Sequence, residues 1–142
     1  MADTVLVAYD GSSLARRALA YALRKCPDDD LVVIHVVDPV YAVYEAEFGG
    51  PASAEAWAAD VGAESERLLE EAASAAADHG GTVTTVSETG KPERCVLAAV
   101  DEYDVDHVVV GSHGRTGVSR LVMGSTAEAV MRRSSVPVTV VR

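Results

Sequence analysis

Short apolar runs rich in β-branched residues alternate along this chain with longer segments in which apolar residues recur every three or four positions. The runs are typical of buried strands and the longer segments of amphipathic helices, so the alternation predicts βαβ units and a largely parallel sheet. Strands are predicted over residues 4–8, 31–37, 82–87, 107–110 and 136–141. Helices are predicted between them, over about 13–26, 53–78 and 92–103 and from about 125 onward.

Local signals set the predicted ends of these helices. Ser12 or Ser13 is the N-cap candidate of the first helix, and Pro27 ends it. Pro92 falls in the first turn of a later helix, where its missing N–H is tolerated. Residues 38–52 follow no period and contain an aromatic cluster. The cluster consists of Tyr41, Tyr44 and Phe48. It is open whether these side chains form a lid over a ligand site, a surface for a partner or a cover for the core.

Length and composition narrow the class of protein. The 142 residues are enough for one core, so a single α/β domain with helices on both faces of the sheet is expected over residues 1–142. No stretch approaches the roughly 20 continuous apolar residues that span a bilayer, and the first residues carry no basic leader. We therefore expect a cytoplasmic, soluble protein with no membrane partner.

Charge and cysteine content argue against a nucleic-acid-binding protein and against a disulfide or zinc site. The net charge of −10 opposes binding to nucleic acid, because phosphates are repelled at long range. Lys25 and Lys91 are the only lysines, a bias that would suit either a high-salt cytoplasm or an arginine-favouring genome. Cys26 and Cys95 have no CxxC partner or nearby metal ligand, so both are expected to be small core residues.

The segment GSHGRTGVSRLVMGST, residues 111–126, follows a predicted strand and leads into a predicted helix. Gly111 at the strand end would let a ligand approach the backbone, and Gly114 permits a positive φ in a loop around phosphates. Gly124 and Ser125 stand at a helix N-terminus, which favours an anion. These features together predict a phosphate cradle, whereas two of the glycines alone would indicate only turns. The spacing matches neither the P-loop nor the dinucleotide fingerprint GxGxxG.

This loop, the Asp that closes the first strand and the chain length together resemble the ATP-binding branch of the universal stress protein family. The resemblance implies an adenine nucleotide alpha hydrolase-like fold with a five-stranded parallel sheet in the order 3-2-1-4-5. It also implies ATP at the switch point between the first and fourth strands. The residues that it places around the nucleotide are Asp10, Val36, Val110, Gly111, Gly114, Gly124, Ser125 and Thr126.

Several of these roles have local alternatives. On its own, Asp10 followed by Gly11 is equally typical of a turn. Arg115 and Arg120 could each offset phosphate charge or be solvated, and of the two Arg115 is assigned to phosphate. Because ATP and the protein are both anionic, Mg²⁺ or Mn²⁺ is expected to accompany the nucleotide, on ligands that the sequence does not identify.

No catalytic residue is predicted. His113 is the only group in the loop suited to acid–base work near neutral pH, and no carboxylate is evidently placed to orient it. We therefore expect nucleotide binding with slow or no hydrolysis. The resemblance implies a nucleotide-responsive regulator in the stress response, with at most weak hydrolysis or self-phosphorylation. The alternatives are a partner-binding module without nucleotide and a slow ATPase. The resemblance further implies a homodimer through antiparallel pairing of the last strand, Val136 to Val141, although Pro137 could shield that edge.

Overall fold

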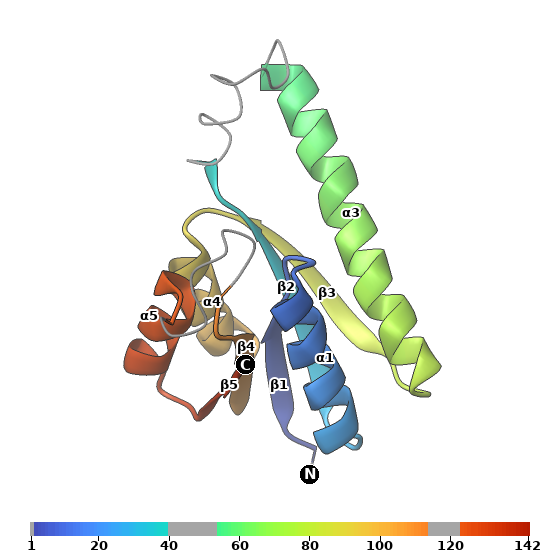
Figure 1. The fold of residues 1–142 in the computed structure, drawn as a ribbon, viewed down its shortest axis with the longest axis vertical. Helices are drawn as coiled ribbons and strands as arrows, with labels where there is room; N and C mark the ends of the chain where they lie inside the picture. The colour runs from blue at the N-terminus through green and yellow to red at the C-terminus, as the bar shows by residue number, and fades with distance from the viewer. Residues whose placement is uncertain (1, 40–53, 114–122) are drawn as a thin grey trace.

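The alternation of strands and helices is confirmed by a computed structural model, which describes residues 2–39, 54–113 and 123–142 (Figure 1). The elements are β1 (Thr4–Ala8), α1 (Ser13–Lys25), β2 (Asp30–Val37), α3 (Ala54–Asp78), β3 (Val83–Thr89), α4 (Pro92–Glu102), β4 (His107–Gly111), α5 (Ser125–Arg133) and β5 (Val138–Val141). The predicted ends agree with these bounds to within about two residues. The aromatic cluster of residues 41, 44 and 48 lies outside the described residues.

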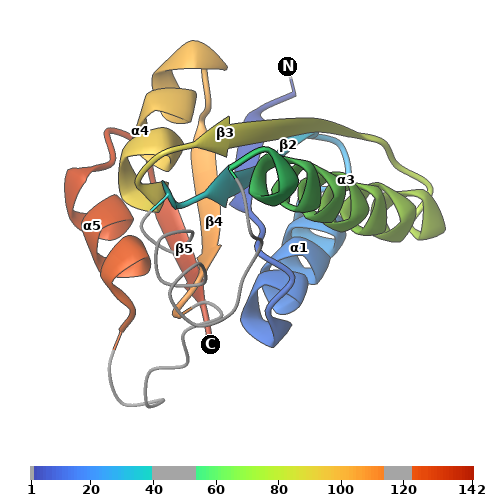
Figure 2. The ribbon, with the colours of Figure 1, turned by 90° about the horizontal axis from the view of Figure 1, so that it is seen from above.

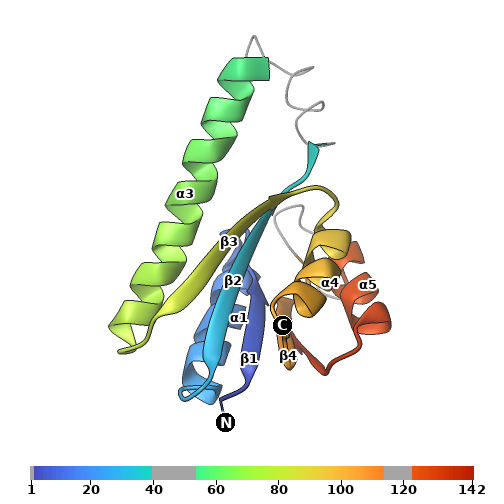
Figure 3. The same cartoon turned by 180° about the vertical axis from the view of Figure 1, so that it is seen from behind.

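The five strands form one parallel sheet in the order β3-β2-β1-β4-β5, which confirms the implied topology. Helices α1 and α3 cover one face and α4 and α5 the other, so the molecule has three layers (Figures 2 and 3). The connections that leave β1 and β4 diverge to opposite faces. This places the topological switch point at the carboxyl ends of those two strands.

Alternate residues of each inner strand face the two helical layers, because side chains in a strand point alternately to opposite sides. One core cluster joins Val7, Val33 and Val109 to residues of α1 and α3, and the other joins Leu6, Ile34 and Val108 to residues of α4 and α5. Cys26 and Cys95 are free thiols, each half-buried at the edge of one cluster. Among the described helices, none is both long and apolar enough to span a membrane.

Candidate functional site

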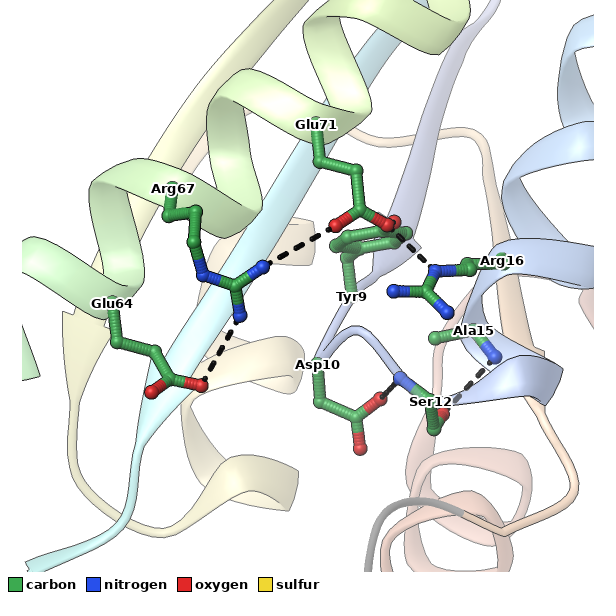
Figure 4. Close-up of polar contacts among 8 residues, drawn as sticks. All are labelled: Tyr9, Asp10, Ser12, Ala15, Arg16, Glu64, Arg67 and Glu71. Atoms are coloured by element: carbon green, nitrogen blue, oxygen red, sulfur yellow. Dashed lines mark hydrogen bonds and ion pairs between the residues drawn. The ribbon is translucent and has the colours of Figure 1, made fainter.

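The turn between β1 and α1 is held by its own polar groups (Figure 4). The backbone N–H of Ser12 donates to Oδ1 of Asp10 over 2.9 Å, and Oγ of Ser12 accepts from the N–H of Ala15 over 3.2 Å. Ser12 is therefore the N-cap, one of the two predicted residues. The turn chemistry that the Asp-Gly pair indicates is thus present, and it leaves Asp10 at the carboxyl end of β1 beside the first turn of α1.

Gly11 makes this turn possible in two ways. Its φ is +78°, a backbone conformation that glycine adopts readily and that side chains disfavour. Its Cα also faces Leu68 of α3 so closely that an added Cβ would lie 2.5 Å from Cδ2 of Leu68. The local sequence predicts only a turn at Gly11, because the contact with a residue of α3 is not encoded locally.

A carboxylate of α3 bridges the end of β1 and the first turn of α1. Oε1 of Glu71 accepts from the hydroxyl of Tyr9 and from Nε of Arg16, each over 2.6 Å, while Oε2 lies 3.7 Å from Arg67 (Figure 4). Burial, and next the hydrogen bond to Glu71, raise the pKa of Tyr9 to about 12. The hydrogen bond from Arg16, followed by that from Tyr9, lowers the pKa of Glu71. No sequence signal linked these residues.

His35 fastens the end of β2 to the end of β1. It is 7% exposed, and its Nδ1 lies 2.9 Å from the carbonyl oxygen of Tyr9. A carbonyl can only accept, so Nδ1 carries the proton. Since the amide of Tyr9 also donates to Ile34 over 2.8 Å, both backbone groups of Tyr9, just before Asp10, are bound to β2. The sequence signal for this contact is the histidine within the apolar run LVVIHVV.

The end of β4 packs against the start of α1. A Cβ on Gly111 would lie 3.0 Å from Cβ of Leu14 and 3.2 Å from its carbonyl carbon. Gly111 is thus required by close helix–strand packing, a reason different from the ligand approach that the sequence predicts. One residue later, the amide of Ser112 donates to Val141 over 2.8 Å, so the end of β5 reaches the same place.

The N-terminus of α5 joins this group. Gly124 is the N-cap; its amide donates to the carbonyl of Ser112 over 2.6 Å, and an added Cβ would lie 3.1 Å from Cα of His113. Ser125 is exposed and Thr126 half-buried in the first turn of α5, where backbone N–H groups have no partner within the helix. An outward-facing set of donors and the positive end of a helix dipole therefore lie beside the end of β4.

The structure brings together most of the predicted residues. Asp10, Gly111, Gly124 and the first turn of α5 are linked through the contacts above, all at the carboxyl ends of β1 and β4. Val110 is buried and pairs with Val140, while Val36 is half-buried at the end of β2 and pairs with Glu88. Gly114 and Arg115 lie outside the described residues, as does Arg120.

Within residues 2–39, 54–113 and 123–142, no group of three or more His, Cys, Asp or Glu side chains is arranged to hold a metal ion. Nδ1 of His113 lies 3.3 Å from Oγ of Ser112. For a divalent cation, the chemically suitable group at this edge is the carboxylate of Asp10, which would share the ion with ligand oxygens and water.

Comparison with known proteins gives one family. The model of the universal stress protein family matches residues 1–142. Universal stress protein YxiE of Bacillus subtilis (strain 168) is 30% identical over 148 aligned positions, which cover 100% of both chains.

Solved structures give the same fold. That of protein MJ0577, a universal stress protein of Methanocaldococcus jannaschii, has a TM-score of 0.83 at 24% identity, with 99% of this chain and 96% of that chain covered. The crystal structure of a universal stress protein in complex with cAMP has a TM-score of 0.71 at 26% identity, with 99% and 97% covered. The sheet and its flanking helices are thus those of the adenine nucleotide alpha hydrolase-like fold.

Proposed function

Because the chain belongs to the universal stress protein family, we propose that it binds an adenine nucleotide, ATP with Mg²⁺ or Mn²⁺, at the carboxyl ends of β1 and β4. The observation that carries the proposal is the convergence of Asp10, Gly111 and the N-terminus of α5 at the switch point of the sheet. Open α/β sheets bind ligands at such points. The cAMP-bound relative at 26% identity supports the same class of ligand.

The donor set fits a nucleotide. The first turn of α5 offers backbone N–H groups, the Ser125 hydroxyl and the helix dipole to phosphates. The carboxylate of Asp10 would bind a ribose hydroxyl or a phosphate-bound cation, and the backbone near Val36 would receive the adenine. Val110 and Gly111 would lie beneath the ribose, and Gly114 and Arg115 would complete the phosphate loop.

The proposed biological role is a cytoplasmic regulator that responds to ATP in the stress response, built as one domain over residues 1–142. It would act as a homodimer formed by β5 at the open edge of the sheet. Hydrolysis would be weak or absent, because the Glu71 carboxylate is engaged by Tyr9 and Arg16 and the described part of the site has no organised clamp of cations for phosphoryl transfer. A partner-binding module without nucleotide is the second candidate, favoured only by the open sheet edges.

The test is a calorimetric titration of Mg·ATP into wild-type protein and into Ser125→Asp. An aspartate in the first turn stabilises α5 through the dipole, so folding is retained while the phosphates meet a negative charge. We expect affinity to fall at least about tenfold, a difference of roughly 1.4 kcal/mol. The matched control is Thr84→Asp on exposed β3, which adds the same charge far along the sheet. Equal losses in both variants, or no binding by wild type, would refute the proposed site.

A further inference from the structure

Two contacts of α3 with the body of the protein fall on the residues that flank Asp10. Where burial is described, α3 residues before Ser65 are exposed or half-buried, whereas Leu68 is buried. Figures 1 and 3 show this first part of the helix extending past the end of the sheet. Leu68 fills the space beside Gly11, and Glu71, one turn later, binds Tyr9.

The link made by Glu71 is short and joins three elements. A single oxygen, Oε1, accepts two hydrogen bonds, one from Tyr9 directly after β1 and one from Arg16 of α1, both over 2.6 Å. Hydrogen bonds to a carboxylate are stronger than neutral ones, and that from Tyr9 is sheltered, since Tyr9 is 3% exposed. The side chain of Glu71 is 31% exposed and that of Arg16 57% exposed, so solvent screens the ion pair and the hydrogen bond from Tyr9 is the more sheltered part of this bridge.

We propose that Glu71, together with Leu68, is a positioning residue that fixes the β1–α1 turn from α3 and thereby sets the affinity of the Asp10 site for nucleotide. The inference rests on the proposed function for its ligand. It goes beyond that function by giving α3 a role in nucleotide affinity. The same helix supports the Asp10 site through Leu68 and Glu71 and extends past the end of the sheet in its first part.

The expected consequences follow from the shared acceptor. Without the Glu71 carboxylate, Tyr9 and Arg16 lose the group that holds the end of β1 to the start of α1. The turn that carries Asp10 and Ser12 then samples more conformations. The apparent affinity for nucleotide is the intrinsic affinity multiplied by the fraction of molecules in the binding conformation, so it falls in proportion to that fraction. A coupling of ordinary size would weaken Mg·ATP binding about fivefold or more. By reciprocity, bound nucleotide must slow hydrogen exchange in α3 around Leu68.

Four variants isolate this role. Glu71→Ala removes the acceptor, and Tyr9→Phe removes one hydrogen bond while the ring stays in place. Glu71→Gln keeps an acceptor oxygen at the same length and is expected to lie between Glu71→Ala and wild type. The matched control is Glu70→Ala, the same change at the neighbouring exposed position of α3. Thermal melts identify any variant that does not fold. If Glu71→Ala does not fold, Tyr9→Phe tests the same hydrogen bond, because it leaves the core volume nearly unchanged.

Two readouts are taken on these proteins: the dissociation constant for Mg·ATP and, without nucleotide, the exchange rate of the Ser12 amide, which donates to Asp10. We expect weaker binding and roughly tenfold faster Ser12 exchange in Glu71→Ala and Tyr9→Phe, with Glu70→Ala like wild type. Wild-type affinity in Glu71→Ala, or equal losses in Glu70→Ala, would overturn the inference. If wild type binds no ATP, the proposed function fails, and the exchange of Ser12 decides alone: acceleration supports the positioning role and an unchanged rate overturns it.

Discussion

Leu68 fills the space that a side chain at Gly11 would need, although the two residues are distant in sequence. The Cδ2 atom of Leu68 lies 2.5 Å from the position that a Cβ on Gly11 would take. Leu68 is 1% exposed, so it has little room to move away. The φ of Gly11, +78°, adds a second requirement for glycine at the same position. The turn of Asp10 and the packing of α3 are therefore parts of one arrangement.

Gly11→Ala is expected to destabilise the protein by about 2–4 kcal/mol, from the strained φ and from overlap with a buried side chain. Urea unfolding measures the effect. Gly62→Ala is the matched control, because Gly62 is helical and has nothing within 4 Å of its added Cβ; it is expected to stabilise the protein by roughly 0.5–1 kcal/mol. If both substitutions changed stability alike, the contact with Leu68 would carry no weight.

The raised pKa of Tyr9 predicts a loss of stability in alkaline solution. An unfolded tyrosine ionises near pH 10, whereas Tyr9 in the folded protein ionises at about 12. Between these values the unfolded state has lost a proton that the folded state keeps, so the free energy of unfolding falls as pH rises, by up to about 2 kcal/mol. Urea unfolding at pH 9 and pH 11.5 measures this fall in wild type and in Tyr9→Phe. The difference between the two proteins isolates Tyr9, and parallel curves would contradict the assignment.

The proposed dimer depends on hydrogen-bonding groups at the open edge of β5. The carbonyls of Pro137 and Val141 face β4, where they accept from Val108 and Ser112. Because backbone groups alternate in direction along a strand, those of Val138 and Val140 face outward. Val140→Pro removes one outward donor without breaking a bond to β4.

Light scattering coupled to size exclusion is expected to give a monomer mass for Val140→Pro and a dimer mass for wild type. Thr85→Pro is the control at the opposite edge of the sheet. The amide of Gly90 donates to Val37 of β2, and because backbone groups alternate along a strand, the amide of Thr85 faces outward from β3. A dimer that survives Val140→Pro but dissociates with Thr85→Pro would move the interface to β3.

The elements could be predicted because their signals are local. Ser12 caps α1 through its own hydroxyl, Pro92 occupies the first turn of α4, and the apolar periods mark the buried faces. Gly111 and Gly124 were also located correctly, at the end of β4 and at the start of α5. Their physical reason was only partly foreseen, because Gly111 is small to admit Leu14 and Gly124 to admit the backbone of His113.

The support of the site could not be predicted, because its partners are far apart in the chain. Tyr9 and Glu71 are separated by 62 positions and His35 from Tyr9 by 26. Nothing in the local pattern distinguishes Glu71 from its exposed neighbour Glu70. Only the packing of α3 against β2 and β3 decides which carboxylate meets the tyrosine, and that packing is a property of the whole sheet.

The most direct test of the central claim is to identify the small molecules released by denaturing protein that was purified without added nucleotide. Mass spectrometry is expected to find an adenine nucleotide, ATP foremost, in roughly stoichiometric amount with wild type and in strongly reduced amount with Ser125→Asp. The contradicting result is no nucleotide from wild type together with no heat of Mg·ATP binding in the titration. That outcome would leave partner binding through the sheet edges as the better account of the molecule.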